Sequence, residues 1–302
     1  MDKNLFLLMR VGKMKKLIFH NINDFELAHI FECGQCFRWK KEEDASYTGV
    51  TKFGVMNVSK KDKDVFICGE FVKNGSFTND EEYVMSCVRE YFDLDTDYLA
   101  IKSVLKKGDM NMKNAIKFGY GIRILNQDAW EMLISYIISA ANNIPRISKT
   151  IENISMAYGQ KIDFNGKDYY LFPTSEELSK ATVEDLRQLN LGFRDKYVYH
   201  AAVLVESGKI DLEQIMNMDY RSAKRELMKI DGVGEKVADC ILLFSMKKRE
   251  AFPVDTWIKK VMEQLYDESR NLKKISKFAE EKFGQYGGIA QQYLFYYMRE
   301  VG

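Results

Sequence analysis

The feature that most constrains the fold of this chain is a change in the spacing of its apolar residues near residue 79. Before that point, from residue 16 to about residue 70, the chain is interpreted as an alternation with a period of two, broken by the turn residues Lys-Asp-Lys-Asp at residues 61–64. This alternation is typical of strands with one buried face, so it predicts a small antiparallel sheet. One helical stretch, predicted over residues 24–31, interrupts the sheet.

After residue 79 the apolar residues follow the helical period, for example along one face of residues 130–138. A sheet followed by helices is the order of an α+β fold. The chain has 302 residues, which is enough for two domains of roughly 150 residues each. We therefore predict an N-terminal antiparallel sheet domain with flanking helices at residues 1–118 and an all-helical domain at residues 119–302.

The overall charge does not indicate a polyanionic partner, because 45 basic residues against 44 acidic ones leave a formal net charge of +1. A surface that binds nucleic acid would then be a local basic patch. The five cysteines are an odd number without the spacing of a disulfide framework. Because there is also no long apolar run, we expect a soluble chain in a reducing compartment.

Residues 1–13 precede Met14, and their short apolar stretch lacks a small-residue cleavage site. The segment is therefore not interpreted as a secretory leader. Two interpretations stay open, a remnant of an expression tag and an upstream start before Met14.

The segment with the most chemical information is Leu-Met-Lys-Ile-Asp-Gly-Val-Gly-Glu-Lys-Val-Ala-Asp-Cys at residues 227–240. We predict that one helix ends at Ile230 and that a second begins near Glu235, with a tight hairpin at Gly232 and Gly234. Glycines let a backbone approach a phosphate closely, and the free amides at the start of the second helix point at the anion. The hairpin alone fits a plain connector between two helices equally well.

Lys236 and Cys240 lie four residues apart, so they share a helix face beside an otherwise apolar run. A lysine in that place is partly desolvated, which favours its neutral, nucleophilic amine. The alternative is a solvated lysine in the first helical turn. Further along the chain, Asp255 opens the next predicted helix, and plain N-capping is the alternative role for this residue.

These residues resemble a known family. The motif Gly-Val-Gly-x-Lys-Val-Ala-Asp at residues 232–239, followed by Pro-Val-Asp at residues 253–255, resembles the helix-hairpin-helix glycosylase superfamily and, within it, the 8-oxoguanine DNA glycosylase/AP lyase family. Three further segments match the family: Gly-Gln-Cys-Phe-Arg-Trp at residues 34–39, Asn-Asn-Ile-Pro-Arg-Ile at residues 142–147 and Ala-Gln-Gln-Tyr-Leu-Phe at residues 290–295. The resemblance covers nearly the whole chain.

The resemblance implies a bifunctional enzyme of base excision repair that flips 8-oxoguanine out of duplex DNA, cuts it from its sugar and nicks the strand. Lys236 would attack the sugar C1′ and form a Schiff base that permits β-elimination. Asp255 would stabilise the developing sugar cation. This chemistry requires no metal and no cofactor. The expected partner is double-stranded DNA containing 8-oxoguanine, bound by a monomer that does not contact a membrane.

The resemblance also implies a pocket for the flipped base. The carbonyl of Gly34 would accept the N7 proton that 8-oxoguanine carries and guanine lacks. Gln291 would contact the Watson–Crick edge, while Phe295 and Cys240 would enclose the base from two sides, with Pro253 beside them. Without the resemblance, Phe295 is interpreted as an ordinary core residue.

On the opposite strand, the resemblance implies that Asn142, Arg146, Phe193 and Arg194 fill the vacated gap and contact the base opposite the lesion. On this side of the site, the chain departs from the family pattern at two places. Ala141 stands where the family has an asparagine, and Phe193 stands where it has a tyrosine. Fewer polar contacts then depend on the opposite base, so we expect weak discrimination between cytosine and adenine there.

The residues expected to contact the DNA backbone are Gly232, Gly234 and Trp257. Trp257 stands where the family usually has a histidine, so an indole N–H replaces a group that can carry charge. The carbonyls of Met228, Ile230 and Val233 are candidates for jointly binding a structural cation.

Three alternatives accompany this interpretation. The CxxC pair Cys33 and Cys36 has the spacing of a redox or metal half-site, but no second pair of ligands follows, so we assign it to the base-contacting loop, where serine is commoner than Cys36. A monofunctional alkylbase glycosylase shares the hairpin and the aspartate but lacks a lysine at the position of Lys236. A non-catalytic helix-hairpin-helix module would bind DNA without forming an imine.

We expect a cytoplasmic, nucleoid-associated location in a bacterium or archaeon and a nuclear one in a eukaryote.

Overall fold

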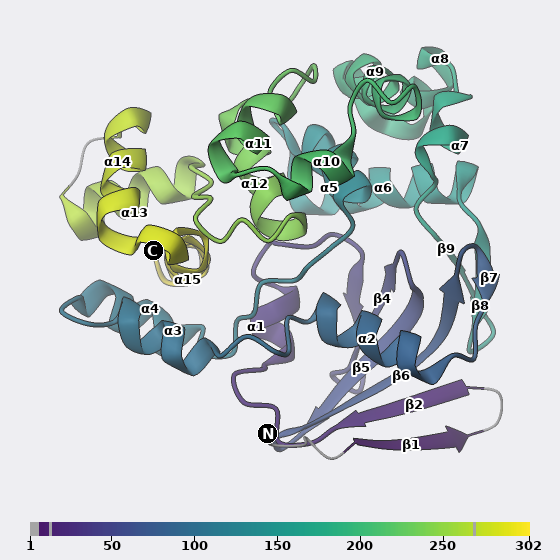
Figure 1. The fold of residues 1–302 in the computed structure, drawn as a ribbon, viewed down its shortest axis with the longest axis horizontal. Coiled ribbons are helices and arrows are strands. Elements are labelled where there is room, and N and C mark those ends of the chain that lie inside the picture. The colour runs from purple at the N-terminus through teal and green to yellow at the C-terminus, as the bar shows by residue number, and fades with distance from the viewer. Residues whose placement is uncertain (1–5, 12–13, 268–269) are drawn as a thin grey trace.

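The computed structural model describes residues 6–11, 14–267 and 270–302, and Figure 1 shows their arrangement. An antiparallel sheet occupies one corner of the molecule, and helices that mostly come later in the chain cover the rest. The predicted α+β order is confirmed, with a sheet domain first and a helix-hairpin-helix domain after it.

Among the described residues the sheet has seven strands in the order β1-β2-β6-β5-β4-β3, with β7 paired to β6, and every pairing is antiparallel. The strands are β1 (Phe6–Val11), β2 (Met14–Phe19), β3 (Trp39–Lys41), β4 (Tyr47–Thr51), β5 (Gly54–Lys61), β6 (Asp64–Lys73) and β7 (Ser76–Phe77).

The sheet is longer than the alternation of residues predicts, because it begins at Phe6 and ends at Phe77. Strand β1 pairs with β2 along its full length. Its sequence, Phe-Leu-Leu-Met-Arg-Val, is an apolar run without period two, so alternation cannot reveal it. Residues 1–5 and 12–13 lie outside the described residues, and the two interpretations of residues 1–13 stay open.

The helices are α1 (Leu27–Phe31), α2 (Glu81–Tyr91), α3 (Tyr98–Leu105), α4 (Met110–Phe118), α5 (Ala129–Ser139), α6 (Ile144–Tyr158), α7 (Ser175–Ser179), α8 (Val183–Leu186), α9 (Asp195–Glu206), α10 (Leu212–Asn217), α11 (Tyr220–Leu227), α12 (Glu235–Ser245), α13 (Thr256–Tyr266), α14 (Leu272–Phe283) and α15 (Gly287–Val301). Helix α1 begins three residues later than predicted. The reason is that Asp24 adopts a left-handed backbone conformation (φ 53°), and its carboxylate accepts a hydrogen bond from Lys102 instead of starting a helix.

One hairpin interrupts the part of the chain predicted to be all helical. Strands β8 (Lys161–Phe164) and β9 (Lys167–Tyr170) pair around Asn165 and Gly166, which both have positive φ. Asn-Gly between alternating residues is a strong hairpin signal, so this element was visible in the sequence. The apolar side chains of Ile162 and Phe164 pack with Val50, Val55 and Val72 of the N-terminal sheet.

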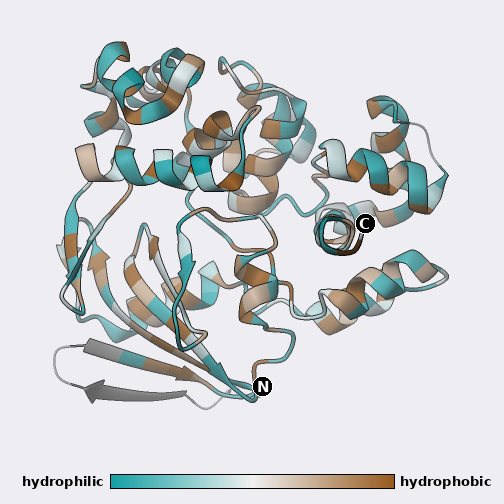
Figure 2. Ribbon diagram, turned by 180° about the vertical axis from the view of Figure 1, so that it is seen from behind, coloured by the Kyte–Doolittle hydropathy of each residue, from teal (hydrophilic) through white to brown (hydrophobic). Residues whose placement is uncertain are grey.

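Two large apolar cores lie on either side of this junction. The sheet core is rich in aromatic rings, such as Phe25 and Phe31 against Phe92. The helical core is built mainly around α5, α12 and α15, and it also takes up apolar side chains of α3 and α4. Figure 2 shows apolar and polar residues mixed along the outer helices, as expected for helices that bury one face.

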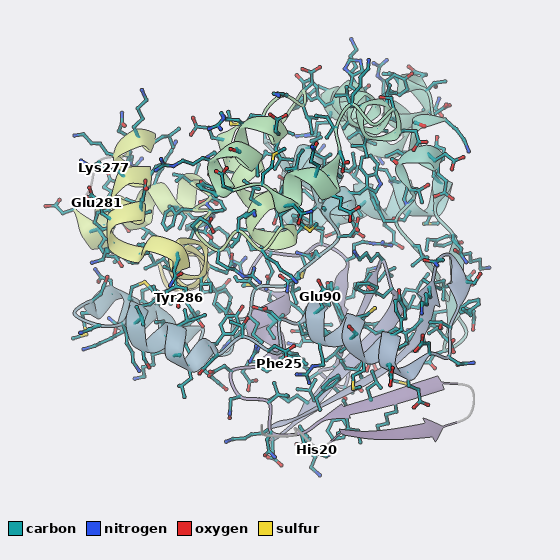
Figure 3. All side chains as sticks on the ribbon, viewed as in Figure 1. His20, Phe25, Glu90, Lys277, Glu281 and Tyr286 are labelled. Atoms are coloured by element: carbon teal, nitrogen blue, oxygen red, sulfur yellow. The ribbon has the colours of Figure 1, made fainter. Side chains whose placement is uncertain are left out.

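Charged residues cover the outside of the molecule. Figure 3 shows Lys277 and Glu281 on the outer side of α14, where their charged groups lie 3.6 Å apart. Of the helices in the described part of the chain, none is long and apolar enough to cross a membrane.

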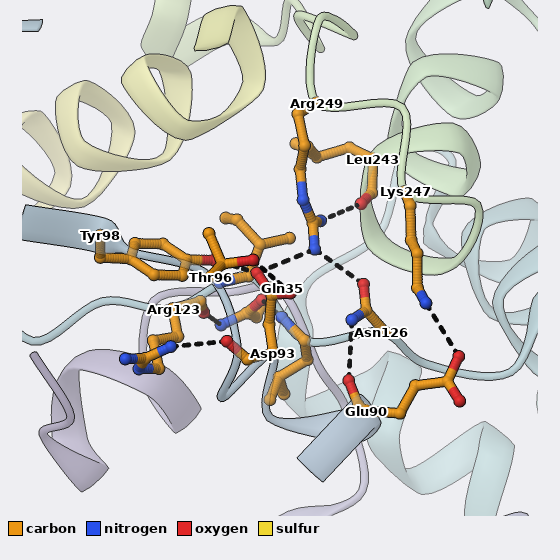
Figure 4. A network of polar contacts seen from close by, with 12 residues as sticks. Gln35, Glu90, Asp93, Thr96, Tyr98, Arg123, Asn126, Leu243, Lys247 and Arg249 are labelled. Carbon is orange, nitrogen blue, oxygen red and sulfur yellow. Dashed lines mark hydrogen bonds and ion pairs between the residues drawn. The ribbon is translucent and has the colours of Figure 1, made fainter. Parts of the chain in front are cut away.

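A network of polar side chains joins the sheet core to the helical core (Figure 4). Arg249 donates to the side chain of Asn126 at 2.7 Å and lies 3.2 Å from the carboxylate of Asp93. Arg123 donates to the carbonyl of Asp93 at 2.6 Å. The side chain of Gln35 joins this region by donating to the carbonyl of Arg123 at 2.8 Å. These bonds fix the connector before α5 against the end of α2.

Candidate active site

The glycine hairpin between α11 and α12 takes the predicted form, with one difference at its start. Helix α11 ends at Leu227, three residues before the predicted end, and a further turn is closed by the amide of Ile230 on the carbonyl of Leu227. Helix α12 begins at Glu235, as predicted. Gly232 has φ 84°, and a Cβ there would lie 3.0 Å from the ring of Tyr197, so only glycine fits.

Gly234 is the N-cap of α12 and leaves the start of this helix accessible. Among the residues that the structure describes, no side chain caps the helix, and a Cβ built on Gly234 meets none of their atoms within 4 Å. The first-turn amides therefore face open space. This is the geometry in which a helix N-terminus binds an anion such as a phosphate.

Lys236 stands in the first turn of α12 and is partly buried. Its Nζ lies 5.3 Å from the ring centroid of Tyr136, a residue of α5. Cys240 follows one turn later and is buried. Burial raises the pKa of the Cys240 thiol to about 11, although the nearby charge of Lys236 opposes the shift. The amine and a neutral thiol therefore share one face of α12.

Asp255 is the N-cap of α13, and its Oδ1 accepts a hydrogen bond from the amide of Ile258 at 2.8 Å. Burial raises the pKa of this carboxyl, while the bond from Ile258 and the charge of Lys236 act in the opposite direction. Capping is thus one role of Asp255. The carboxylate also lines the same pocket as Lys236, which allows it a second role beside the amine.

A pocket of about 340 Å³, counting its open mouth, joins these groups to residues from distant parts of the chain. Its walls are formed by Gly34, Tyr136, Lys236, Cys240, Phe244, Pro253, Asp255, Gln291, Gln292 and Phe295. The structure therefore brings together all of the residues predicted as catalytic or base-contacting.

Three wall residues were not predicted: Tyr136, Phe244 and Gln292. The rings of Tyr136 and Phe244 stack with their centroids 5.9 Å apart. Their spacing in the sequence indicates only that each faces a helical core, which gives no sign of a pocket. Gln292 follows Gln291 directly, and a second buried amide on an apolar helix was the available signal.

Helix α15 supplies an unusual polar atom to the pocket. Gln291 is only 4% exposed, and its Oε1 has no hydrogen-bond partner among the described residues. A buried amide oxygen without a partner costs free energy, so such an atom indicates a place for a donor that is absent here. Phe295, one turn later, adds an aromatic wall.

The Gly34 loop (residues 32–38) forms the opposite wall. Gly34 has φ 83°, and a Cβ there would lie 3.2 Å from Phe295 Cε1, so glycine permits both the turn and the close approach. The thiols of Cys33 and Cys36 are buried and donate to the carbonyls of Ile30 and Phe31 of α1. Burial raises the pKa of both thiols.

No group of His, Cys, Asp and Glu side chains in the described ranges is arranged to hold a metal ion. The Ile230 carbonyl, one of the three candidates for a cation, already accepts a hydrogen bond from the amide of Val233 at 3.0 Å. The cation at the hairpin stays a prediction. Trp257, expected at the DNA backbone, carries the amine of Lys260 4.5 Å above its ring.

The residues expected opposite the lesion lie on two exposed loops. Phe193 is 61% exposed, and the guanidinium of Arg194 stacks on its ring at 4.3 Å. Arg194 itself is buried and donates to the carbonyls of Ala140, Ala141 and Leu191. In this state its donors are used to hold the other loop, so its contact with an opposite base stays a prediction.

Asn142 belongs to that other loop, which connects α5 to α6, and Arg146 lies in the first turn of α6. Asn142 donates to the carbonyl of Ile138 at 3.1 Å, and Asn143 caps α6 by accepting from the amide of Arg146. Arg146 is exposed, and its charge, after burial, contributes to lowering the pKa of Arg194. The charge of Arg146 thus influences Arg194, and the roles of both residues at the opposite base stay predictions.

Comparison with protein families agrees with this geometry. The model described as "8-oxoguanine DNA glycosylase, N-terminal domain" matches residues 17–133. The model described as "HhH-GPD superfamily base excision DNA repair protein" matches residues 134–285. A probable N-glycosylase/DNA lyase of Methanothermobacter thermautotrophicus is 32% identical over 232 residues, which is 70% of this chain and 73% of that protein. An N-glycosylase/DNA lyase of Saccharomyces cerevisiae is 29% identical over 327 residues, 93% of this chain and 85% of the yeast protein.

Solved structures agree as well. The 8-oxoguanine glycosylase/lyase of Clostridium acetobutylicum, in complex with dsDNA containing cytosine opposite 8-oxoG, matches with a TM-score of 0.90 and 44% identity over 99% of each chain. A 3-methyladenine DNA glycosylase of Archaeoglobus fulgidus, at 21% identity and a TM-score of 0.73, shares the fold. The chain therefore belongs to the 8-oxoguanine DNA glycosylase family of helix-hairpin-helix base excision DNA repair proteins.

Proposed function

We propose that this protein is a bifunctional DNA glycosylase and AP lyase that excises 8-oxoguanine from duplex DNA. The observation that carries the proposal is the convergence of an amine and a carboxylate, Lys236 and Asp255, on a pocket that holds an unpartnered buried acceptor, Gln291 Oε1. The Watson–Crick edge of 8-oxoguanine carries the N–H donors that this oxygen lacks. Family membership and the DNA complex of the Clostridium acetobutylicum relative support the same substrate.

Base selection follows from the proton that 8-oxoguanine carries on N7. Guanine has a lone pair there, whereas 8-oxoguanine has a proton that the Gly34 carbonyl can accept. A guanine in the same position would leave that acceptor unpaired and place two lone pairs face to face. The unpaired acceptor alone costs on the order of 1–3 kcal/mol.

The reaction begins when the neutral Lys236 amine attacks C1′ of the flipped nucleotide. The bond between C1′ and N9 breaks, its electron pair leaves with the base, and the base takes up a proton. Opening of the sugar ring gives a protonated imine between C1′ and Nζ. Loss of a C2′ proton then expels the 3′ phosphate, which completes β-elimination. Asp255 stabilises the positive charge that develops on the sugar.

Binding to DNA has to offset the cost of flipping, a few kcal/mol per nucleotide. The open N-terminus of α12 at Gly232 and Gly234 is placed to bind a backbone phosphate beside the nucleophile. Phe193, which is exposed on its loop, is placed to fill the gap in the stack. We propose that the protein acts in this way as a monomer, in the cytoplasm of a bacterium or archaeon or in the nucleus of a eukaryote.

Borohydride trapping tests the proposal. A duplex with 8-oxoguanine opposite cytosine is incubated with the protein and sodium borohydride, which reduces the imine to a stable covalent link. We expect a protein–DNA adduct and release of the oxidised base. A monofunctional alkylbase glycosylase would release a base without an adduct, and a non-catalytic module would do neither. Either result contradicts the proposal.

A further inference from the structure

The Gly34 loop is held by its carbonyl groups in an unusual pattern. The carbonyl of Glu32 accepts from Arg299, that of Cys33 accepts from Gln292 at 2.6 Å, and that of Gln35 accepts from Gln127 at 2.8 Å. Among the described residues no hydrogen bond ends on the carbonyl of Gly34. Side chains thus donate hydrogen bonds to the carbonyls on both sides of Gly34. The carbonyl of Gly34 itself remains available, and it is the acceptor that the proposed function assigns to the N7 proton of the lesion.

Arg299 differs from the other members of this set by its position and charge. It lies in the last turn of α15, one turn after Phe295, and its side chain is 19% exposed. Its guanidinium carbon lies 5.5 Å from the ring centroid of Phe295 and 5.6 Å from that of Tyr296. One of its nitrogens lies 3.2 Å from the place where a Cβ of Gly34 would be. The group therefore contacts the back of two pocket walls at once.

We propose that Arg299 is a positioning residue that determines how strictly the pocket selects 8-oxoguanine. It fixes the Gly34 loop by its bond to Glu32 and fixes Phe295 by stacking behind the ring. Glycine has the freest backbone of all residues, so the Gly34 carbonyl turns away easily unless its neighbours are held. A carbonyl that is held in place disfavours guanine, because guanine leaves it without a hydrogen-bond donor and this costs free energy. A mobile carbonyl can turn away from guanine, so it avoids that cost and selects less strictly.

The inference rests on the proposed function. Cleavage of a preformed abasic site makes it possible to test the role of Arg299 separately from the proposed function. A preformed abasic site has no base to select, so its cleavage by Lys236 needs neither the Gly34 carbonyl nor the wall of Phe295. A residue that only maintains the fold would affect base release and abasic-site cleavage together. A residue that positions the base wall affects base release alone.

The experiment compares wild type with Arg299→Ala, Arg299→Lys and Glu300→Gln. Glu300 pairs with Arg299 at 2.7 Å, so Glu300→Gln removes the ion pair and keeps the guanidinium on the loop. Single-turnover rates are measured for base release from an 8-oxoguanine duplex and for cleavage of an abasic-site duplex. We expect Arg299→Ala to slow base release about tenfold, the effect of losing one hydrogen bond to a charged group. Cleavage of the abasic site should stay at the wild-type rate.

The two control variants separate the contact from the ion pair. Arg299→Lys keeps a cation and one donor and should recover part of the rate, while Glu300→Gln should behave as wild type. An unchanged rate of base release in Arg299→Ala overturns the inference, and so does an equal loss of both activities in Arg299→Ala and Arg299→Lys. If wild type cleaves abasic sites but releases no 8-oxoguanine, the proposed function itself is wrong.

A binding measurement gives a second readout in a background that cannot react. In Lys236→Gln protein, the affinity for a duplex with 8-oxoguanine is compared with the affinity for the same duplex with guanine. We expect Arg299→Ala to reduce this ratio and to leave the affinity for the guanine duplex unchanged. A ratio that does not change contradicts the inference.

Discussion

The base pocket and the loops on the opposite-base side differ in how their polar groups are used. Around the pocket, the carbonyls beside Gly34 are occupied by buried or partly buried side chains, and two acceptors are left for a ligand. On the opposite-base side, Phe193 is largely exposed, and the donors of Arg194 are directed to the chain itself. The pocket is therefore organised before DNA binds, and the opposite-base side is not.

This contrast has a consequence for specificity. Polar groups that are already held in position lose little entropy on binding. A ligand that does not pair with them therefore binds at the full free-energy cost of the missing hydrogen bonds. Exposed apolar groups fill a gap equally well next to any base. The molecule is thus expected to be strict about the damaged base and tolerant about its partner. Five predictions test this contrast and the stability of the fold around it.

The largest effect is expected for Lys236→Gln. Glutamine keeps much of the side-chain volume but cannot form an imine, so base release and borohydride trapping should both be lost while DNA binding remains. Gel-based trapping and an affinity measurement on the same duplex decide the outcome. Normal trapping by this variant would place the nucleophile outside the pocket.

A smaller loss is expected for Asp255→Asn, because the residue has two separable roles. Asparagine still caps α13, so the thermal midpoint should change little. Removal of the negative charge beside the sugar should slow base release about 10²-fold to 10³-fold, as for other groups that stabilise a transition-state charge. Full activity together with an unchanged midpoint would reduce Asp255 to a helix cap.

On the opposite-base side the expected effect is a ratio of a few fold. Excision opposite cytosine should exceed excision opposite adenine only modestly, at the low end of the roughly 1–3 kcal/mol that a mismatched base pair costs in a specific interface. A preference of several hundredfold for cytosine would show that the departures at Ala141 and Phe193 have no effect.

Ala141→Asn is the matched variant for this side. Ala141 has φ 50°, a conformation that asparagine tolerates better than alanine. We therefore expect the variant to raise both the preference for cytosine and the thermal midpoint. Rates on the two duplexes and a melting curve are the measurements, with Phe193→Tyr as the companion variant.

The smallest effect concerns stability beneath the pocket. Glu131 is buried 3.7 Å from Arg38, at the end of the Gly34 loop, and burial raises its pKa to about 7. Because this value lies above that of the unfolded chain, the folded state holds the proton more tightly. The protonated Glu131 carboxyl therefore makes its full contribution to the free energy of unfolding at low pH, and this contribution is lost as the pH rises through about 7. Glu131→Gln should remove this pH-dependent loss of stability between about pH 5 and about pH 8.

Much of the site could be predicted because its residues sit in motifs with fixed local geometry. The hairpin, the start of α12 and the cap at Asp255 follow from glycine, helix termini and capping chemistry, which depend on near neighbours. Tyr136 and Gln292 were missed because their roles depend on contacts with the Gly34 loop, about one hundred or more residues away. Spacing along a helix predicts which face is buried, but it does not name the partner on that face.

The same limit explains the differences in the fold. Strand β1 is held by its partner β2 and not by its own alternation, so only pairing reveals it. Arg194 is predicted to contact the base opposite the lesion, and in this structure its guanidinium donates to the carbonyl of Ala140. An arginine in a loop looks exposed in the sequence until the loop that it supports is known.

The hairpin β8–β9 means that the change from strands to helices along the chain does not separate two independent folding units. Its residues Ile162 and Phe164 complete a cluster with Val50, Val55 and Val72, so each part supplies surface that the other needs. A fragment without the sheet would present two large apolar side chains to water. Heating or denaturant should consequently melt the protein in a single cooperative step, and a protease should find no stable intermediate cut between the two parts.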